Sequence, residues 1–234
     1  MNDEFSKTLM QLQRGDGDAA FWSRAFLVLP VTGATVATVG SVMGSETLSA
    51  TGEVARRLDE RQFDLGEGPC WDAVNQAAPI AEVDFAANGP ARWPLLWAAL
   101  IAETIGSIYA FPMTVGTVQI GAVDLYSHDP SSLSEMHQRQ AQAMAEVIGQ
   151  HVVRGALATE ADEKAPVDTP FSRRIVHQAT GLVLAQVDVD AEDAMLLIQT
   201  RAHASGTSMM DVAEQLIAGR LRYVRVDGRI EVES

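Results

Sequence analysis

Apolar runs along the chain predict a β-sheet in the first two thirds of the sequence. Residues 107–114 and 117–126 are two such runs, and the pair Val115-Gly116 between them is short enough to join them as a hairpin. Two earlier runs also predict strands. The first is rich in Val and Thr and ends at a glycine, and the second is short and apolar and ends at polar residues. The predicted strands are residues 34–43, 79–85, 107–114 and 117–126.

Helical periodicity surrounds these strands. Pro69 suits the first turn of a helix, where its missing N–H costs nothing, and it opens a predicted helix over residues 69–76. Further helices are predicted over residues 51–61, 93–104 and 132–157, the last from apolar residues that repeat every 3, 4 or 8 positions. Strands that pair in sequence order, with helices before and after them, favour an α+β sheet domain.

The pattern changes near residue 170, after a polar stretch that contains two prolines and no apolar periodicity. Three short amphipathic helices are predicted beyond it, and they must pack as a bundle because none can bury its apolar face alone. Residues 223–232 alternate around Asp227-Gly228, which predicts a β-hairpin. The predicted parts are a sheet domain at residues 1–157, a linker at 158–170, a helical domain at 171–223 and a tail at 224–234.

Composition limits the classes of partner. The 234 residues are 47% apolar and 21% charged, as in ordinary globular proteins, and 31 acidic against 17 basic side chains give a net charge of −14. Such a chain has no overall attraction for phosphates or anionic membranes, so RNA contact needs a local group of cations. Cys70 stands alone and no apolar stretch approaches the roughly 20 residues that cross a bilayer, so we expect a cytoplasmic protein without membrane contact.

An ordered set of residues in the second domain resembles the ANTAR domain, over residues 168–225. The resemblance implies a three-helix module that binds RNA in bacterial transcription antiterminators. One departure is Thr180, where many members of the family have lysine. The residues that carry the resemblance are Ile175-Val-His-Gln-Ala179-Thr-Gly181-Leu, then Ala194, Leu197 and Ala202, then Met210-Asp-Val-Ala213, and the extension Arg220-Leu-Arg-Tyr223.

The first domain is similar to GAF domains over residues 12–155. The motifs are Leu65-Gly-Glu-Gly-Pro-Cys70-Trp-Asp-Ala73, Asp84, Arg92-Trp-Pro94, Ser107-Ile-Tyr-Ala-Phe-Pro112 and Ile120-Gly-Ala-Val-Asp-Leu-Tyr126. The resemblance implies a sensor with a small-molecule pocket on one face of its sheet and terminal helices that dimerise. The signature of cyclic-nucleotide GAF domains is absent. The expected fold class is therefore α+β, a GAF-like antiparallel sheet domain flanked by helices and followed by an all-α three-helix ANTAR domain.

Cations from the three predicted helices of the ANTAR-like segment are expected to share one face and to form the RNA surface. Residues 166–234 carry seven basic and ten acidic side chains, so affinity must come from local grouping, unless these arginines are only a solvated face. Gln178 and Thr180 lie off the predicted apolar stripe and are candidates for contact with unstacked bases. Gly181 is expected to let helices approach closely. The predicted RNA-binding residues are Arg173, Arg174, Gln178, Thr180, Arg201, His203, Arg220 and Arg222.

Five residues of the GAF-like motifs are predicted to bind a small molecule. Each has a structural alternative: Cys70 at a helix start is favoured as a buried small side chain, Asp84 and Arg92 can pair without a ligand, and Trp93 can belong to the core. The five histidines lack metal-binding spacing, so neither a metal nor a cofactor is expected. The predicted ligand-binding residues are Cys70, Asp84, Arg92, Trp93 and Tyr109.

The combination predicts a homodimeric, signal-responsive antiterminator whose ANTAR module binds stem-loops of nascent mRNA under the control of the GAF sensor. The alternative is a dimeric protein-interaction module with a non-RNA partner, which exposed side chains at Met209 and Met210 would favour. An enzyme is not expected. The methionine sulfoxide reduction of some GAF proteins needs at least two cysteines, and this chain has only Cys70.

Overall fold

The chain forms two compact units, Met1–Phe171 and Ser172–Ser234. The computed structural model describes the backbone of residues 2–40, 44–162 and 173–233. Each unit has its own hydrophobic core and is described by itself.

A five-stranded antiparallel sheet organises the first unit, with the strand order β2-β1-β5-β4-β3. Strands β4 and β5 form the predicted hairpin, and the β1 and β5 ladder joins it to the edge strand β2. The strands are β1 (Gly33–Thr38), β2 (Glu46–Ala50), β3 (Ile80–Glu82), β4 (Ser107–Val115) and β5 (Val118–Ser127).

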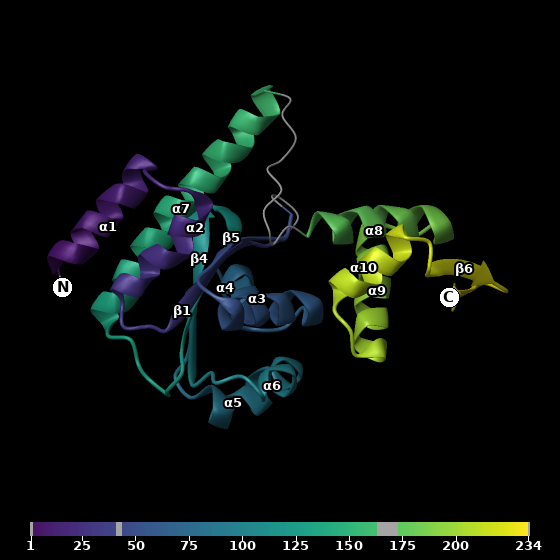
Figure 1. Ribbon diagram of the computed structural model, residues 1–234, viewed down its shortest axis with the longest axis horizontal. Helices are drawn as coiled ribbons and strands as arrows, with labels where there is room; N and C mark the ends of the chain where they lie inside the picture. The colour runs from purple at the N-terminus through teal and green to yellow at the C-terminus, as the bar shows by residue number, and fades with distance from the viewer. Residues whose placement is uncertain (1, 41–43, 163–172, 234) are drawn as a thin grey trace. The chain divides into compact units, whose positions relative to one another are not determined.

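Three helices cover one face of the sheet (Figure 1). They are α1 (Asn2–Arg14), α2 (Ala19–Ala25), which runs into a short 3-10 turn at Phe26–Val28, and the long α7 (Glu135–Asp162). Alternate residues of the strands, such as Phe111 and Val123, point into this layer because neighbouring side chains on a strand face opposite ways. The layer is completed by apolar residues of α7, including Met144 and Ile148.

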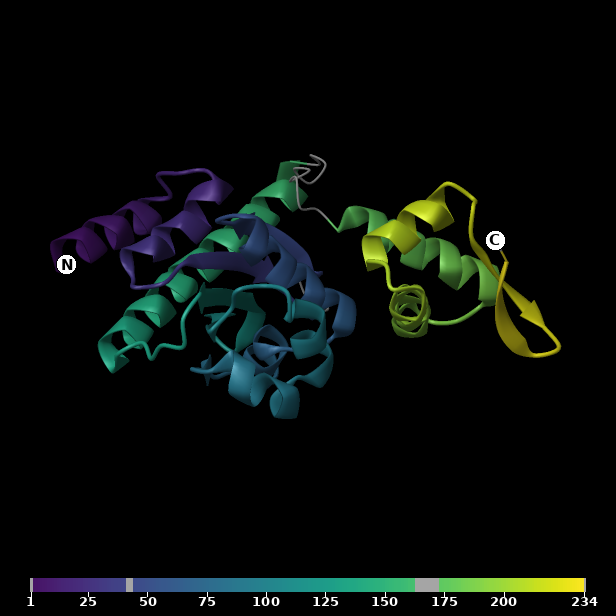
Figure 2. The same ribbon diagram turned by 60° about the horizontal axis from the view of Figure 1, so that its bottom comes forward.

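Four shorter helices cover the other face (Figure 2). They are α3 (Glu53–Leu65), α4 (Pro69–Gln76), α5 (Phe85–Arg92) and α6 (Pro94–Leu100). The intervening strand residues, such as Ile108 and Ala110, pack against the apolar sides of these helices. Helix α4 has the predicted bounds, with Pro69 as its first residue.

Several elements differ from the predicted ones. Strand β2 lies where no element was predicted. A bulge turns its buried polar residues toward both faces of the sheet, which interrupts the alternation of apolar and polar residues. Ser49 forms a hydrogen bond with Ser23 of α2, and Thr47 with Asp59 of α3. Helix α5 occupies part of a predicted strand and loop, and α1 and α2 were not predicted. Helix α7 continues to Asp162, so residues 158–162 of the predicted linker are helical; residues 163–170 lie outside the described residues.

The second unit contains the three predicted helices, α8 (Arg174–Val187), α9 (Ala191–Ser205) and α10 (Met209–Ile217). The side chain of Asp190 accepts from the N–H of Asp193 at the start of α9, and Ser208 forms a capping box with Asp211 at the start of α10. Small and branched residues fill the space between the helices. These buried residues are Val176, Ala179, Val183, Ala194, Ile198, Ala202, Val212, Ala213 and Leu216.

The predicted hairpin is present as β6 (Arg222–Val226) and β7 (Arg229–Glu233). Asp227 and Gly228 both have positive φ, 48° and 80°, as a two-residue hairpin turn requires. The hairpin is fixed to the helices by Tyr223, whose hydroxyl donates to the carbonyl of Leu197 in α9 at 2.8 Å. The predicted three-helix domain is therefore followed by the predicted β-hairpin, which packs against it.

Candidate functional sites

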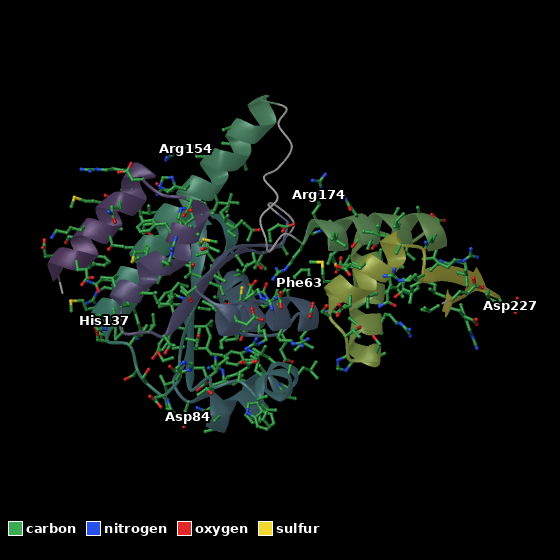
Figure 3. All side chains as sticks on the ribbon, viewed as in Figure 1. Phe63, Asp84, His137, Arg154, Arg174 and Asp227 are labelled. Carbon is green, nitrogen blue, oxygen red and sulfur yellow. The ribbon has the colours of Figure 1, made fainter. Side chains whose placement is uncertain are left out.

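The cations of the second unit lie in two groups along α8. Arg174 starts the helix, and the hairpin contacts its far end, where Arg225 donates to the carbonyl of Val187 at 2.7 Å. A helix of 14 residues is about 21 Å long, which separates the two groups. Figure 3 shows Arg174 at one end of α8 and Asp227, at the tip of the hairpin, beyond the other.

At the far end of α8 the hairpin contributes the buried Tyr223. Burial raises the pKa of Tyr223 to about 12, while the nearby positive charge of Arg201 acts in the opposite direction. Arg222 is exposed and forms an ion pair with Glu233 at 2.9 Å. Arg220 is exposed between α10 and β6, and the predicted cation His203 is exposed near the end of α9. Arg225 was not among the predicted residues, because it reaches the C-terminus of α8 from a strand that lies 38 residues further along the chain.

Three of the residue placements predicted for this unit are corrected. Thr180 is 7% exposed, and its hydroxyl donates to the carbonyl of Val176 at 2.8 Å, so it lies on the buried side of α8. Arg173 is 4% exposed, which leaves little of it for a phosphate to touch. Gly181 is exposed, and a Cβ added there would meet nothing within 4 Å, so close helix packing does not explain it.

Gln178, in contrast, is exposed on α8, as predicted. The exposed or half-exposed residues of the predicted RNA surface are Arg174, Gln178, Arg201, His203, Arg220 and Arg222. Met209 is only 1% exposed, which removes one of the two side chains that would have favoured a protein partner.

The five residues predicted to bind a ligand do not line one cavity. Tyr109 faces the layer of α1, α2 and α7, whereas Cys70 and Trp93 belong to the cores on the opposite face. The hydroxyl of Tyr109 donates to the carbonyl of Ser131 and accepts from the N–H of Leu133, so it fixes the loop that leads into α7. Cys70 is buried, in agreement with the structural alternative for this residue.

Asp84 and Arg92 also act structurally, and they do not pair with each other as the alternative suggested. The carboxylate of Asp84 accepts from the N–H of Ala87 and caps α5. Arg92 donates to the buried carboxylate of Glu82 at 2.9 Å and lies 4.1 Å from the ring centroid of Trp93. The indole N–H of Trp93 donates to Asp72, across the same group of helices.

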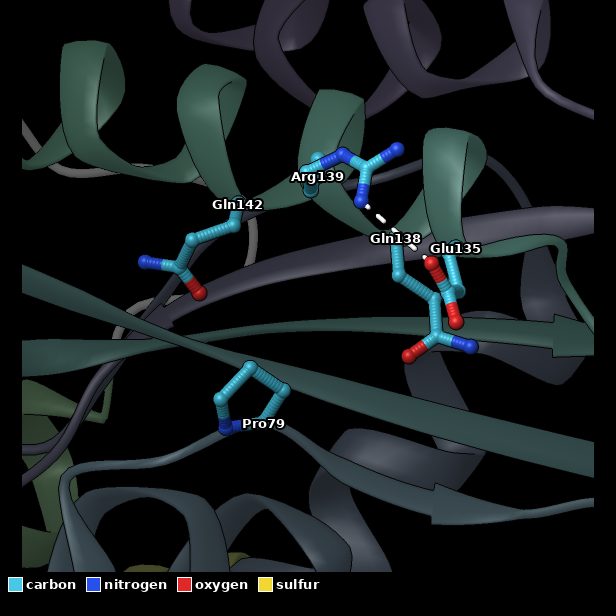
Figure 4. A pocket seen from close by; sticks show the side chains of 5 residues that line it. All are labelled: Pro79, Glu135, Gln138, Arg139 and Gln142. Carbon is cyan, nitrogen blue, oxygen red and sulfur yellow. Dashed lines mark hydrogen bonds and ion pairs between the residues drawn. The ribbon is translucent and has the colours of Figure 1, made fainter.

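A shallow pocket of about 310 Å³ lies elsewhere, on the α7 side of the sheet near its β3 edge (Figure 4). It is formed largely by one side of α7, where Arg139 and Glu135 form an exposed ion pair at 3.5 Å. None of the five predicted ligand-binding residues lines it. The lining residues are Pro79, Glu135, Gln138, Arg139 and Gln142.

A buried polar cluster lies between the sheet and helices α3 and α4. Asp124 of β5 is 2% exposed, and its Oδ2 accepts from the Gln62 side-chain amide at 2.5 Å. The Gln62 oxygen in turn accepts from the backbone N–H of Cys70, at the start of α4. Asp59, 3% exposed, accepts from the hydroxyl of Thr47.

The electrostatic state of this cluster is unusual. Burial, and then the charge of Asp59, raise the pKa of Asp124 to about 8, against the hydrogen bond from Gln62. Asp124 belongs to one of the GAF-like motifs but was not among the predicted site residues. The available signal was an aspartate inside an otherwise apolar strand.

Within the described residues, no helix is both long and apolar enough to span a bilayer. The same part of the chain contains no group of three or more His, Cys, Asp or Glu side chains placed to hold a metal ion.

The chain thus combines an antiparallel sheet between two helical layers with a separate three-helix unit that carries exposed arginines. The family comparisons agree with it. The GAF domain model matches residues 24–153, more than half of the chain, and the ANTAR domain model matches residues 171–217. The chain belongs to the GAF domain family and carries an ANTAR domain after it. It is a signal-regulated RNA-binding regulator of the ANTAR type, built from sensor and regulatory domains rather than catalytic ones.

Three solved structures are similar to part of the chain at low sequence identity. The GAF domain of a phosphoenolpyruvate-protein phosphotransferase from Acinetobacter is 7% identical, with a TM-score of 0.49 over 71% of this chain and 96% of that one. A putative GAF sensor protein from Burkholderia vietnamiensis is 14% identical, with a TM-score of 0.47 over 67% and 92%. A type II free methionine-R-sulfoxide reductase from Thermoplasma acidophilum is 17% identical, with a TM-score of 0.43 over 64% and 96%. No curated protein sequence matches the chain.

Proposed function

We propose that this protein is a transcription antiterminator that binds stem-loops of nascent mRNA in the cytoplasm, under the control of a signal received by its GAF unit. The observation that carries the proposal is the joining of a sensor domain and an ANTAR domain in one chain. Binding of the ANTAR unit to a stem-loop would compete with formation of a terminator. The domains proposed for these two tasks are the GAF-like domain, which ends with α7 at Asp162, and the ANTAR-like domain at residues 171–223, followed by the tail at 224–234.

The proposed RNA surface uses the exposed side chains at both ends of α8. Arg174 and Gln178 form one contact, and the cations near the hairpin form the other. Their separation suits contact with two parts of one stem-loop, an unstacked loop that side chains can read and a stem that offers phosphates. Because the chain carries a net charge of −14, attraction to RNA depends on these local cations. The second contact comprises Arg201, His203, Arg220 and Arg222.

A salt titration of RNA binding tests this surface. The probe is a pool of short stem-loop RNAs with randomised loops, bound to the full chain on filters. Arg174→Ala, Arg201→Ala and Arg220→Ala should each weaken binding and lower the slope of log affinity against log salt by about 1. Arg139→Ala, which removes an exposed arginine from the first unit, is the matched control. Equal effects of all four substitutions, or none, would contradict the proposed surface.

We further propose that the protein is a homodimer and that its GAF unit binds a small molecule. Helix α7 supports the first part, since it is 28 residues long and carries exposed apolar side chains at Met136 and Leu157, 44% and 62% exposed. Terminal helices of this kind pair by burying such residues. Sedimentation equilibrium of the full chain and of a Met136→Glu, Leu157→Glu variant measures this. A monomeric parent protein would exclude the dimer.

A further inference from the structure

Two neighbouring buried oxygens in the first unit have no hydrogen-bond partner among the described residues. They are Oδ1 of Asp124 and Oγ1 of Thr35. The two residues are directly opposite each other in the β5 and β1 ladder, and they are 2% and 1% exposed. Side chains at such positions start about 5 Å apart and point to the same face of the sheet. A buried polar group without a hydrogen-bond partner destabilises the folded state, so we expect both oxygens to share a partner.

The number of available oxygens limits what this partner is. A hard metal ion takes about six or more oxygen ligands, and here Oδ2 of Asp124 and Oε1 of Gln62 are already used in hydrogen bonds. A proton needs only one carboxyl oxygen and one acceptor. A proton on Oδ1 of Asp124 and the hydroxyl of Thr35 would satisfy each other through one bridging water molecule.

We propose that Asp124 is a buried proton-binding site of the sensor unit, neutral in the folded protein near pH 7, and that loss of its proton loosens helices α3 and α4 from the sheet. The cover over the site comes from these two helices. Gln62 of α3 donates to Asp124 and holds the first turn of α4 through the N–H of Cys70. An ionised Asp124 would need water, and water can enter only if this cover moves.

The groups that face Asp124 stabilise its neutral, protonated form rather than its ionised form. Helix α3 presents Asp59 and Gln62, helix α4 presents the thiol of Cys70, and strand β4 presents Ala110, which pairs with Asp124. Tyr126 lies two residues further along the same face of β5. Within the described part of the chain, Asp59 is the charged group whose field acts on Asp124, and it disfavours a second negative charge. The rise in the pKa of Asp124 to about 8 is consistent with this placement.

Trp71 provides a reporter for the proposed motion. It belongs to α4, and its indole N–H donates to the backbone carbonyl of Gln62 at 2.7 Å. In the full chain labelled with ¹⁵N-tryptophan, the Trp71 indole signal, assigned with Trp71→Phe, is followed from about pH 6 to about pH 9.5. We expect it to shift with a midpoint at about pH 8.

Three variants make the test specific. Asp124→Asn keeps the shape but cannot ionise, so the transition of the Trp71 signal should disappear. Glu82→Gln changes a carboxyl group that is equally buried but bonded to Arg92, and the transition should remain. Thr35→Val removes the hydroxyl that lies opposite Asp124, so the midpoint should change. If Asp124→Asn fails to fold, ¹³C-labelled aspartate carboxyl signals of the parent protein give the same answer, since one of them should titrate near pH 8.

Several results would overturn the proposal. A flat Trp71 signal with no aspartate titrating near pH 8 would exclude the buried proton. A transition that persists in Asp124→Asn would assign it to another group. A midpoint that depends on whether sodium or potassium is present, at constant ionic strength, would assign the site to a metal ion. The test concerns the first unit alone, so its outcome is independent of whether the second unit binds RNA.

Discussion

Two glycines show how differently one residue type is used in this protein. A Cβ at Gly121 of β5 would lie 2.0 Å from the carbonyl oxygen of Ala37, so the two central strands would have to separate. At Gly181 of α8 a Cβ meets nothing within 4 Å. We expect Gly121→Ala to lower the free energy of unfolding of the first unit by at least ~1–3 kcal/mol. Gly181→Ala should raise that of the second by ~0.5–1 kcal/mol, because alanine loses less backbone entropy in a helix.

Urea unfolding of the two glycine variants beside the parent protein measures both values. The opposite signs make the pair its own control. Destabilisation by Gly181→Ala would mean that this position is packed against something after all, as the sequence analysis first assumed.

Two buried carboxyl groups of the first unit should respond to pH with opposite signs. Burial alone would raise the pKa of Glu82, but hydrogen bonds from Asn88, the N–H of Asp84 and Arg92 hold it below its ordinary value. The stability that Glu82 provides is therefore present above its unfolded pKa and is lost as the pH falls through the folded one. Asp124, with its raised pKa, provides stability that is present at acidic pH and is lost as the pH rises toward about 8.

The Asp124 contribution can be isolated by difference. We expect the free energy of unfolding of the parent protein, minus that of Asp124→Asn, to fall by roughly 1.4 kcal/mol per pH unit between about pH 5 and about pH 7. Denaturant titrations at several pH values measure it. The corresponding difference for Glu82→Gln should be level over the same range, because Glu82 is already ionised there in both states. A level line for Asp124 would contradict its buried neutral form.

Among the elements, the C-terminal hairpin stabilises the second unit through hydrogen bonds to α8 and α9. Tyr223 bonds to α9 through its hydroxyl and to Gln186 of α8 through its backbone N–H. Arg225 bonds to the last carbonyl of α8. We expect Tyr223→Phe and Arg225→Ala each to lower the free energy of unfolding of this unit by about 1 kcal/mol, the usual net contribution of one hydrogen bond. Arg229→Ala, at an exposed position beside the turn, should change it by less than about 0.5 kcal/mol.

Circular dichroism at the helical band would follow the thermal unfolding of these three hairpin variants. If Tyr223→Phe lowered the free energy of unfolding no more than Arg229→Ala does, the hairpin would not stabilise the second unit.

The elements that were predicted correctly have strong local signals. Helix α4 starts at a proline, the β4 and β5 hairpin has two long apolar runs, and the turn Asp227-Gly228 has the dipeptide that both positive φ values favour. Strand β2 has no such signal, because a bulge sends its polar residues Thr47 and Ser49 into buried bonds on opposite faces. Its place is decided by tertiary partners that lie elsewhere in the chain.

Site residues were less predictable than elements for a similar reason. Burial of Thr180 depends on which side of α8 the other helices take, and a hydroxyl that bonds back to Val176 can lie on an apolar side. The motif residues Arg92 and Tyr109 were read as one site, but strand alternation and hydrogen bonding place them on opposite faces of the sheet. The Asp124 cluster needs four elements to come together, which no local pattern encodes.

For the whole molecule, charge sets the conditions under which RNA binding can be seen. A net charge of −14 opposes the approach of RNA at long range, and the arginines of the second unit attract it only nearby. Added salt screens both effects but also removes the gain from counterion release at each arginine. Variants of the arginines should therefore differ most from the parent protein at low salt, where the local term is largest.

The division into two units also predicts how the whole molecule unfolds. Each unit has its own buried core, so each should melt cooperatively, and calorimetry of the full chain should show two transitions rather than one. Gly121→Ala should lower only one transition temperature and Tyr223→Phe only the other, because substitutions that share no contacts add independently. In the double variant both shifts should appear unchanged. A single transition that either substitution moves would mean that the two units unfold together. A signal that stabilises the sensor unit would then also stabilise the RNA-binding unit.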